Sequence, residues 1–173
     1  MRWLLWLVVA GASGAPTDAR TGLSADPQCE TLRGGSHPGA TGYYVGRLDV
    51  NGESVTGEET WVLFANSAWR AKGAGDCQIT WAVRGRTAPP RNCPGCSVAV
   101  ILDASIDFAN SNCIEGLTQS VVNRAKHQTF FYNVQTAANG VMTVSYESGK
   151  VLGTGHPAEG QIAYTTASAC EWW

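Results

Sequence analysis

The chain has 173 residues, of which 44% are apolar and 15% are charged, and its formal net charge is −2. The apolar content is ordinary, which argues against disorder, and a pI near 5.9 indicates no basic surface for nucleic acid. The sequence contains no apolar run of about 18 residues, so we expect no membrane-spanning helix. The length predicts one domain with enough chain to bury a core.

The N-terminal residues have the layout of a secretory signal peptide. Arg2 precedes an apolar run at residues 3–10, and small residues follow it. We therefore predict a signal peptide over residues 1–15, cleaved after Ala12 or Ala15, and a secreted or periplasmic protein. The chain has no Asn-x-Ser/Thr sequon, which mildly favours a bacterial source.

The rest of the chain is typical of β structure. Residues 16–42 are rich in Pro, Gly, Thr and Ser and predict an irregular N-terminal arm, followed by a single β-rich domain over 43–173. The clearest strand is 77–84, where Cys77, Ile79 and Trp81 lie on one face with period two. Further strands are predicted at 43–50, 61–64, 97–102, 129–134, 141–147 and 161–166.

Turn and helix signals complete the fold prediction. The Asn-Gly pairs at 51–52 and 139–140 predict hairpins. Only residues 117–126 have helix-like spacing, through Leu117, Val121 and Ala125. We therefore expect an all-β fold, an antiparallel β-barrel or β-sandwich with at most one short helix, stapled by disulfides.

Six cysteines are the most specific feature of the sequence, and an even number in an exported chain predicts disulfides. They are Cys29, Cys77, Cys93, Cys96, Cys113 and Cys170. We expect Cys29 to pair with Cys170, which would stabilise the fold by on the order of 4 kcal/mol in the loop-entropy model. The other four are expected to form two bridges, although the sequence does not choose their connectivity.

The segment Cys93-Pro94-Gly95-Cys96 also admits two functional interpretations. A pair of cysteines two residues apart is the arrangement of thiol–disulfide oxidoreductases. A strand follows here rather than a helix, and Pro-Gly suits a type II turn, so structural disulfides are favoured. A zinc site formed by Cys77, Cys93, Cys96 and Cys113 is the second alternative, but we assign no metal and no cofactor.

Two histidines are candidate ligand-binding or active-site residues. His37 and His156 each precede a proline in a Gly-rich stretch, and such loops can hold active sites. A hydrolase would need one of them beside a loop carboxylate. Exposed loop histidines are the simpler interpretation, so the catalytic residues stay unassigned and a non-enzymatic role is favoured.

Four carboxylates are expected to have ordinary roles. Asp103 and Asp107 flank Ile106 and could bind a cation or act as an acid and a base, but solvated loop carboxylates are favoured. Glu58 and Glu59 precede Trp61 and are expected to form a charged turn.

Aromatic residues could mark a ligand surface. Trp81 lies on the apolar face of its predicted strand and is expected in the core. Trp172 and Trp173 are the last two residues, where they either pack against the barrel or form a binding patch; packing is favoured because exposed paired tryptophans are costly.

The chain resembles a group of uncharacterised exported Cys-containing proteins of myxobacteria and related bacteria. The resemblance rests on residues 77–81, Gly85, 93–96 and 149–155, and it extends over about residues 43–170. It implies no particular activity. The leading hypothesis is an exported, disulfide-stabilised β-domain that binds an unknown ligand or protein, or has a structural role at a surface. The alternatives are an exported enzyme and a metal-binding domain.

Overall fold

The structure, a computed structural model, describes residues 22–30, 32–33, 37–38, 40–113 and 126–171. The predicted signal peptide at 1–15, nearly all of the predicted helix at 117–126, and Trp172 and Trp173 lie outside the described residues. Within the described ranges, no helix has the length and apolar character needed to cross a membrane.

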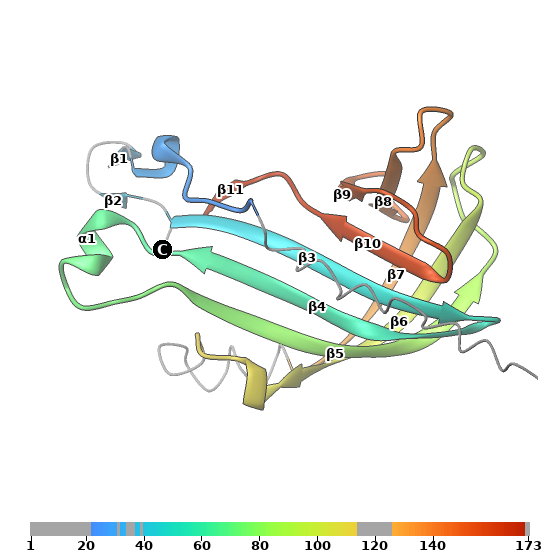
Figure 1. The fold of residues 1–173 in the computed structure, drawn as a ribbon, viewed down its shortest axis with the longest axis horizontal. Helices are drawn as coiled ribbons and strands as arrows, with labels where there is room; N and C mark the ends of the chain where they lie inside the picture. The colour runs from blue at the N-terminus through green and yellow to red at the C-terminus, as the bar shows by residue number, and fades with distance from the viewer. Residues whose placement is uncertain (1–21, 31, 34–36, 39, 114–125, 172–173) are drawn as a thin grey trace, which may run out of the picture.

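The protein is an up-and-down antiparallel β-barrel (Figure 1). The barrel strands are β3 (Ala40–Asn51), β4 (Ser54–Phe64), β5 (Cys77–Ala88), β6 (Val98–Asp107), β7 (His127–Thr136), β8 (Met142–Tyr146), β9 (Val151–Gly155) and β10 (Gln161–Thr165). Each of the eight barrel strands pairs with the next along the chain. The last of them, β10, also pairs with the first, β3, which closes the barrel. This closure selects the barrel over the sandwich.

Short elements gather around the barrel. The strand β11 (Ala169–Glu171) pairs with the first residues of β3. At the same end of the molecule lie the single-turn helix α1 (Ser67–Arg70) and a ribbon of β1 (Leu32–Arg33) and β2 (His37–Pro38) (Figure 1). The 3-10 helices are η1 (Pro27–Glu30) and η2 (Phe108–Asn110).

All seven predicted strands are present, and most are longer than predicted. Because β3 begins at Ala40, the irregular arm is shorter than the predicted 16–42, and part of it forms β1 and β2. Both hairpins are confirmed. The first turns at Gly52 and Glu53, with Asn51 paired to Ser54, and Gly52 has a φ of +60° that favours glycine. The strand β9 was missed because its Gly-rich sequence has low β propensity.

The barrel interior is filled by side chains. Alternate residues of every barrel strand point inward and form one core cluster. Its fully buried members include Leu48, Val55, Leu102, Met142 and Val144. Apolar side chains from all eight barrel strands therefore occupy the described interior.

A glycine allows a tyrosine to cross the barrel at its closing seam. Gly46 on β3 pairs with Tyr164 on β10, and the Tyr164 ring occupies the space that a β-carbon at Gly46 would need. Because the backbone can approach the ring this closely only without a side chain, Gly46 is required where β10 meets β3.

Three disulfides staple the described chain: Cys29–Cys170, Cys77–Cys113 and Cys93–Cys96. The expected pairing of Cys29 with Cys170 is confirmed, as are two further bridges among the other four cysteines. Cys77–Cys113 joins the start of β5 to the segment after η2. Cys93–Cys96 closes a turn in the connection between β5 and β6.

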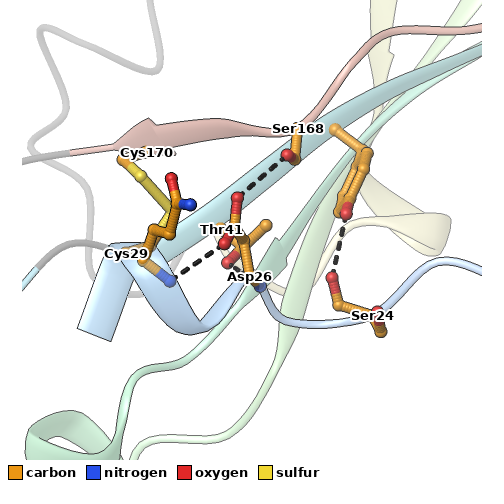
Figure 2. The surroundings of a disulfide bond; sticks show 8 residues. Ser24, Asp26, Cys29, Thr41, Ser168 and Cys170 are labelled. Atoms are coloured by element: carbon orange, nitrogen blue, oxygen red, sulfur yellow. Dashed lines mark hydrogen bonds between the residues drawn. A yellow bond between two sulfur atoms is a disulfide. The ribbon is translucent and has the colours of Figure 1, made fainter. Parts of the chain in front are cut away.

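The bridge between Cys29 and Cys170 fastens the N-terminal arm to the barrel (Figure 2). Beside it, the backbone N–H of Asp26 donates to Thr41 Oγ1 at 2.7 Å, and Ser168 Oγ donates to the Asp26 carboxylate at 3.2 Å. Tyr43 also donates its hydroxyl proton to the Ser24 carbonyl at 2.9 Å. The arm is therefore held by both covalent and polar contacts.

Removing the long-range bridge should destabilise the fold more than removing the short one. In the loop-entropy model a separation of 141 residues corresponds to about 5 kcal/mol, and one of 3 residues to about 2 kcal/mol. Urea unfolding should thus show a larger loss for the C29S/C170S variant than for C93S/C96S. Equal losses would contradict this ranking.

Candidate functional site

A single glutamate lies among the apolar residues of the barrel interior. Glu59 on β4 is only 2% exposed, and it accepts hydrogen bonds from the hydroxyls of Tyr132 on β7, at 3.3 Å, and Tyr164 on β10. The three residues therefore link three strands across the barrel. The expectation that Glu58 and Glu59 form a charged turn is wrong, because both lie within β4.

The alternation of β4 places Glu59 inside. Val55, Glu59 and Trp61 share the inward face, whereas the side chain of Glu58 is exposed to solvent. The facing residue on β3 is Gly46, which allows the Tyr164 ring to lie beside the carboxylate. Burial of this carboxylate is tolerated because both of its oxygens have hydrogen-bond partners.

Burial also controls protonation in this cluster. Desolvation raises the pKa of Glu59 above 4.5, although the hydrogen bonds from Tyr164 and Tyr132 oppose the shift. Desolvation and the neighbouring Glu59 charge also raise the pKa values of Tyr132, Tyr164 and Tyr146. The tyrosines consequently stay protonated donors. Glu59, Tyr132 and Tyr164 are each 2% exposed, so the cluster is shielded from solvent and links three strands inside the barrel.

The outer wall of the barrel carries a hollow of about 540 Å³ over β5, β6 and β7. Arg84 lies directly opposite Asp103, and Ser105 lies opposite His127 one step along the strands. Ala82 and Ala104 complete the lining. The hollow exists because the side chain of Ala82 is shorter than those around it. The rigid strands fix the polar groups around the hollow.

The polar groups of the hollow are available to a ligand. Thr129 Oγ1 donates to Asp103 Oδ1 at 2.8 Å. The ion pairs of the described residues are Arg70–Asp76 and Arg91–Glu147, so the Arg84 guanidinium does not bind Asp103 at ion-pair distance. The side chains of Arg84, Asp103, Ser105 and His127, all able to form hydrogen bonds, therefore face one space of ligand size.

The structure does not bring His37 and His156 together. His37 lies in β2, at the end of the molecule that carries α1, whereas His156 is exposed in the loop between β9 and β10, away from β2 (Figure 1). The two histidines therefore do not share one site, and a hydrolytic role of either one beside a loop carboxylate stays a prediction. The histidine that does lie beside other polar groups is His127, which sequence reasoning missed.

Asp103 and Asp107 lie on the strand β6 rather than in a loop, which corrects the expectation for both. Asp107 caps η2 by accepting from the N–H groups of Ala109, at 3.0 Å, and Asn110, at 3.3 Å. The side-chain hydrogen bond from Asn110 lowers the pKa of Asp107. Asp107 therefore has a local structural role, whereas Asp103 faces the hollow.

The cysteines offer no metal site in this structure. All six are paired, so none of Cys77, Cys93, Cys96 and Cys113 is a free thiolate. Among the described residues, no group of three or more His, Cys, Asp or Glu side chains is placed to hold a metal ion. The four-cysteine zinc site is therefore replaced by two disulfides.

Aromatic side chains line the inward face of the barrel toward the end that carries α1. Trp81 is buried as predicted, and its ring stacks on Tyr44, with centroids 6.1 Å apart. Tyr44 is 38% exposed, and Trp61 packs against the core nearby. These rings form a rim that is continuous with the core, which supports a packing role for them.

Comparisons with protein-family models, curated proteins and solved structures find no match to this chain. The hollow, the Glu59 cluster and the disulfides are therefore interpreted from their own geometry.

The buried glutamate should make stability depend on pH. A carboxyl group whose pKa is raised by folding stabilises the native state below its unfolded pKa, and this contribution is lost as pH rises through the folded value. As pH rises from about 4 to about 8, the free energy of unfolding of the wild type should fall relative to that of Glu59→Gln. Urea titrations at several pH values measure this difference.

Glu58→Gln is the matched control, because Glu58 is adjacent in sequence and exposed. It should follow the wild type across the same pH range. A pH-independent difference between the wild type and Glu59→Gln would show that Glu59 does not titrate differently on folding.

Proposed function

We propose that this protein is an exported, disulfide-stabilised β-barrel that binds a small hydroxylated carboxylate, such as a sugar acid, in the hollow on its outer wall. The observation that carries the proposal is the convergence of Arg84, Asp103, Ser105 and His127 around that hollow. A binding domain was the leading hypothesis from the sequence, and the filled interior favours the outer wall over the barrel lumen.

The four side chains suit such a ligand. The planar guanidinium of Arg84 matches a carboxylate and can bind it with two hydrogen bonds. The Asp103 carboxylate accepts hydrogen bonds from hydroxyl groups, and Ser105 and His127 can each donate or accept one. A volume of about 540 Å³ is of the size that small-molecule sites have, which suits one or two sugar rings.

Export is supported by two independent features. The N-terminal residues 1–15 have the pattern of a signal peptide. Three disulfides are typical of proteins that reside in oxidising compartments. A bacterial origin and a periplasmic or extracellular location belong to the same proposal.

Binding is favoured over hydrolysis at this site. Ser105 and His127 face one another across β6 and β7, but no hydrogen bond joins their side chains. Asp103 accepts from Thr129 rather than from His127, so no carboxylate orients the imidazole. The activated nucleophile, oriented base and acid of a hydrolytic triad are therefore not assembled.

The proposal predicts that Arg84 determines recognition of the carboxylate. Digalacturonate should bind the protein measurably in isothermal titration calorimetry, with a Kd in the range of about 0.1–1 mM. Arg84→Ala should weaken binding about tenfold or more, because the charge-assisted hydrogen bonds are lost. Arg86→Ala is the matched control, since Arg86 is an exposed arginine on the same strand that does not line the hollow.

Two other ligands separate the chemical classes. Digalactose tests whether hydroxyl groups alone suffice, and serine tests recognition of a zwitterion; both should bind at least about tenfold more weakly than digalacturonate. Absence of digalacturonate binding, or equal losses for the Arg84 and Arg86 variants, would overturn the proposal.

A further inference from the structure

The connection between β5 and β6 contains the shortest covalent loop of the protein. Cys93 and Cys96 are three positions apart and bonded to each other, and the N–H of Cys96 donates to the Cys93 carbonyl at 3.1 Å. Both cysteines are half-buried, and Pro94 and Gly95 between them are exposed. By contrast, Cys29 of the longest bridge is 1% exposed. The turn at Cys93–Cys96 is thus open to reagents in solvent.

Other contacts hold this connection in place. The buried Asn133 on β7 accepts from the Arg91 N–H at 3.1 Å and donates to the Arg91 carbonyl at 2.7 Å. After the turn, the N–H of Ser97 donates to the Val134 carbonyl at 3.0 Å. Hydrogen bonds to β7 therefore fix the chain on both sides of the disulfide.

Of the three disulfides, this bond is expected to contribute least to the stability of the fold. It constrains the unfolded chain over only 3 positions, compared with 36 and 141 for the other two bridges. Loop-closure entropy increases with loop length, so this bridge has the smallest stabilising effect of the three. Neither the pairing of β5 with β6 nor the flanking hydrogen bonds to β7 involve the two sulfur atoms.

From these observations we propose that Cys93 and Cys96 form an exchangeable two-electron thiol–disulfide couple on the folded protein, whose partner is a dithiol or a pair of thiols. A thiolate of the partner attacks one sulfur of the pair, which forms a mixed disulfide and releases the other cysteine as a thiolate. The second thiol of the partner then attacks the partner's sulfur atom in the mixed disulfide, which releases the remaining protein cysteine as a thiolate. The partner leaves oxidised, and the pair has gained two electrons and two protons.

The test is a redox titration of the native protein. The chain is equilibrated in mixtures of reduced and oxidised dithiothreitol, and free thiols are alkylated and located by peptide mass spectrometry. Cys93 and Cys96 should be half-reduced at a reduced-to-oxidised ratio at least about tenfold lower than the other four cysteines. Circular dichroism and Tm of this partly reduced form should match those of the C93S/C96S variant.

Re-oxidation of the reduced Cys93–Cys96 pair is tested separately. The selectively reduced protein should convert oxidised glutathione to two equivalents of reduced glutathione as its own disulfide re-forms, and C93S/C96S should convert none. Simultaneous reduction of all three bridges, unfolding on opening of Cys93–Cys96, or no conversion of oxidised glutathione would overturn the proposal. None of these readouts depends on ligand binding in the outer hollow.

Discussion

Closure of this barrel depends on a tyrosine that fits over a glycine and reaches a buried carboxylate. Tyr164 on the last barrel strand lies across Gly46 on the first, and its hydroxyl bonds Glu59 on the neighbouring strand. Tyr132 bonds the same carboxylate from β7. A carboxylate without these partners would be strongly unfavourable in an apolar interior. The two tyrosines and the glutamate therefore make one register of the strands more stable than its neighbours.

The side chains that fill the interior direct the functional proposals to the outer surface. Large side chains occupy the described core, and the three residues of the Glu59 cluster are each 2% exposed. Two surface features contain charged or reactive groups that the fold itself does not require. The hollow over β5, β6 and β7 holds charged and other hydrogen-bonding side chains on rigid strands, and the Cys93–Cys96 turn is open at one connection. Both features depend on β7, which contributes His127 to the first and Asn133 to the second.

Patterns that repeat along the chain allowed most of the fold to be predicted. Period-two alternation located β5, and Asn-Gly pairs located two hairpins, because both signals are local. The strand β9 was missed because glycines have low β propensity. They are suited to this strand because the backbone of β10 lies too close for a β-carbon, which is a tertiary effect. The pairing of Cys29 with Cys170 was expected from their positions near the two ends, whereas the connectivity of the other four required the structure.

The candidate site was less predictable. Glu59 was assigned to a turn because two adjacent glutamates are usually solvated, yet alternation from Trp61 back to Val55 places Glu59 on the inward face. The alternation of β4 is thus a signal in the sequence from which the inward position of Glu59 can be predicted. The outer hollow could not be predicted, since Arg84, Asp103 and His127 meet only through the register of three strands.

The central claim, that the barrel closes around a carboxyl group desolvated by its fold, is tested most directly by carbon-13 NMR of the Glu59 side chain. The resonance is assigned by its loss in Glu59→Gln and followed across a pH titration of the folded protein. The structure predicts a titration midpoint above the ordinary value of 4.5 for this group. A midpoint at or below 4.5 would contradict the account.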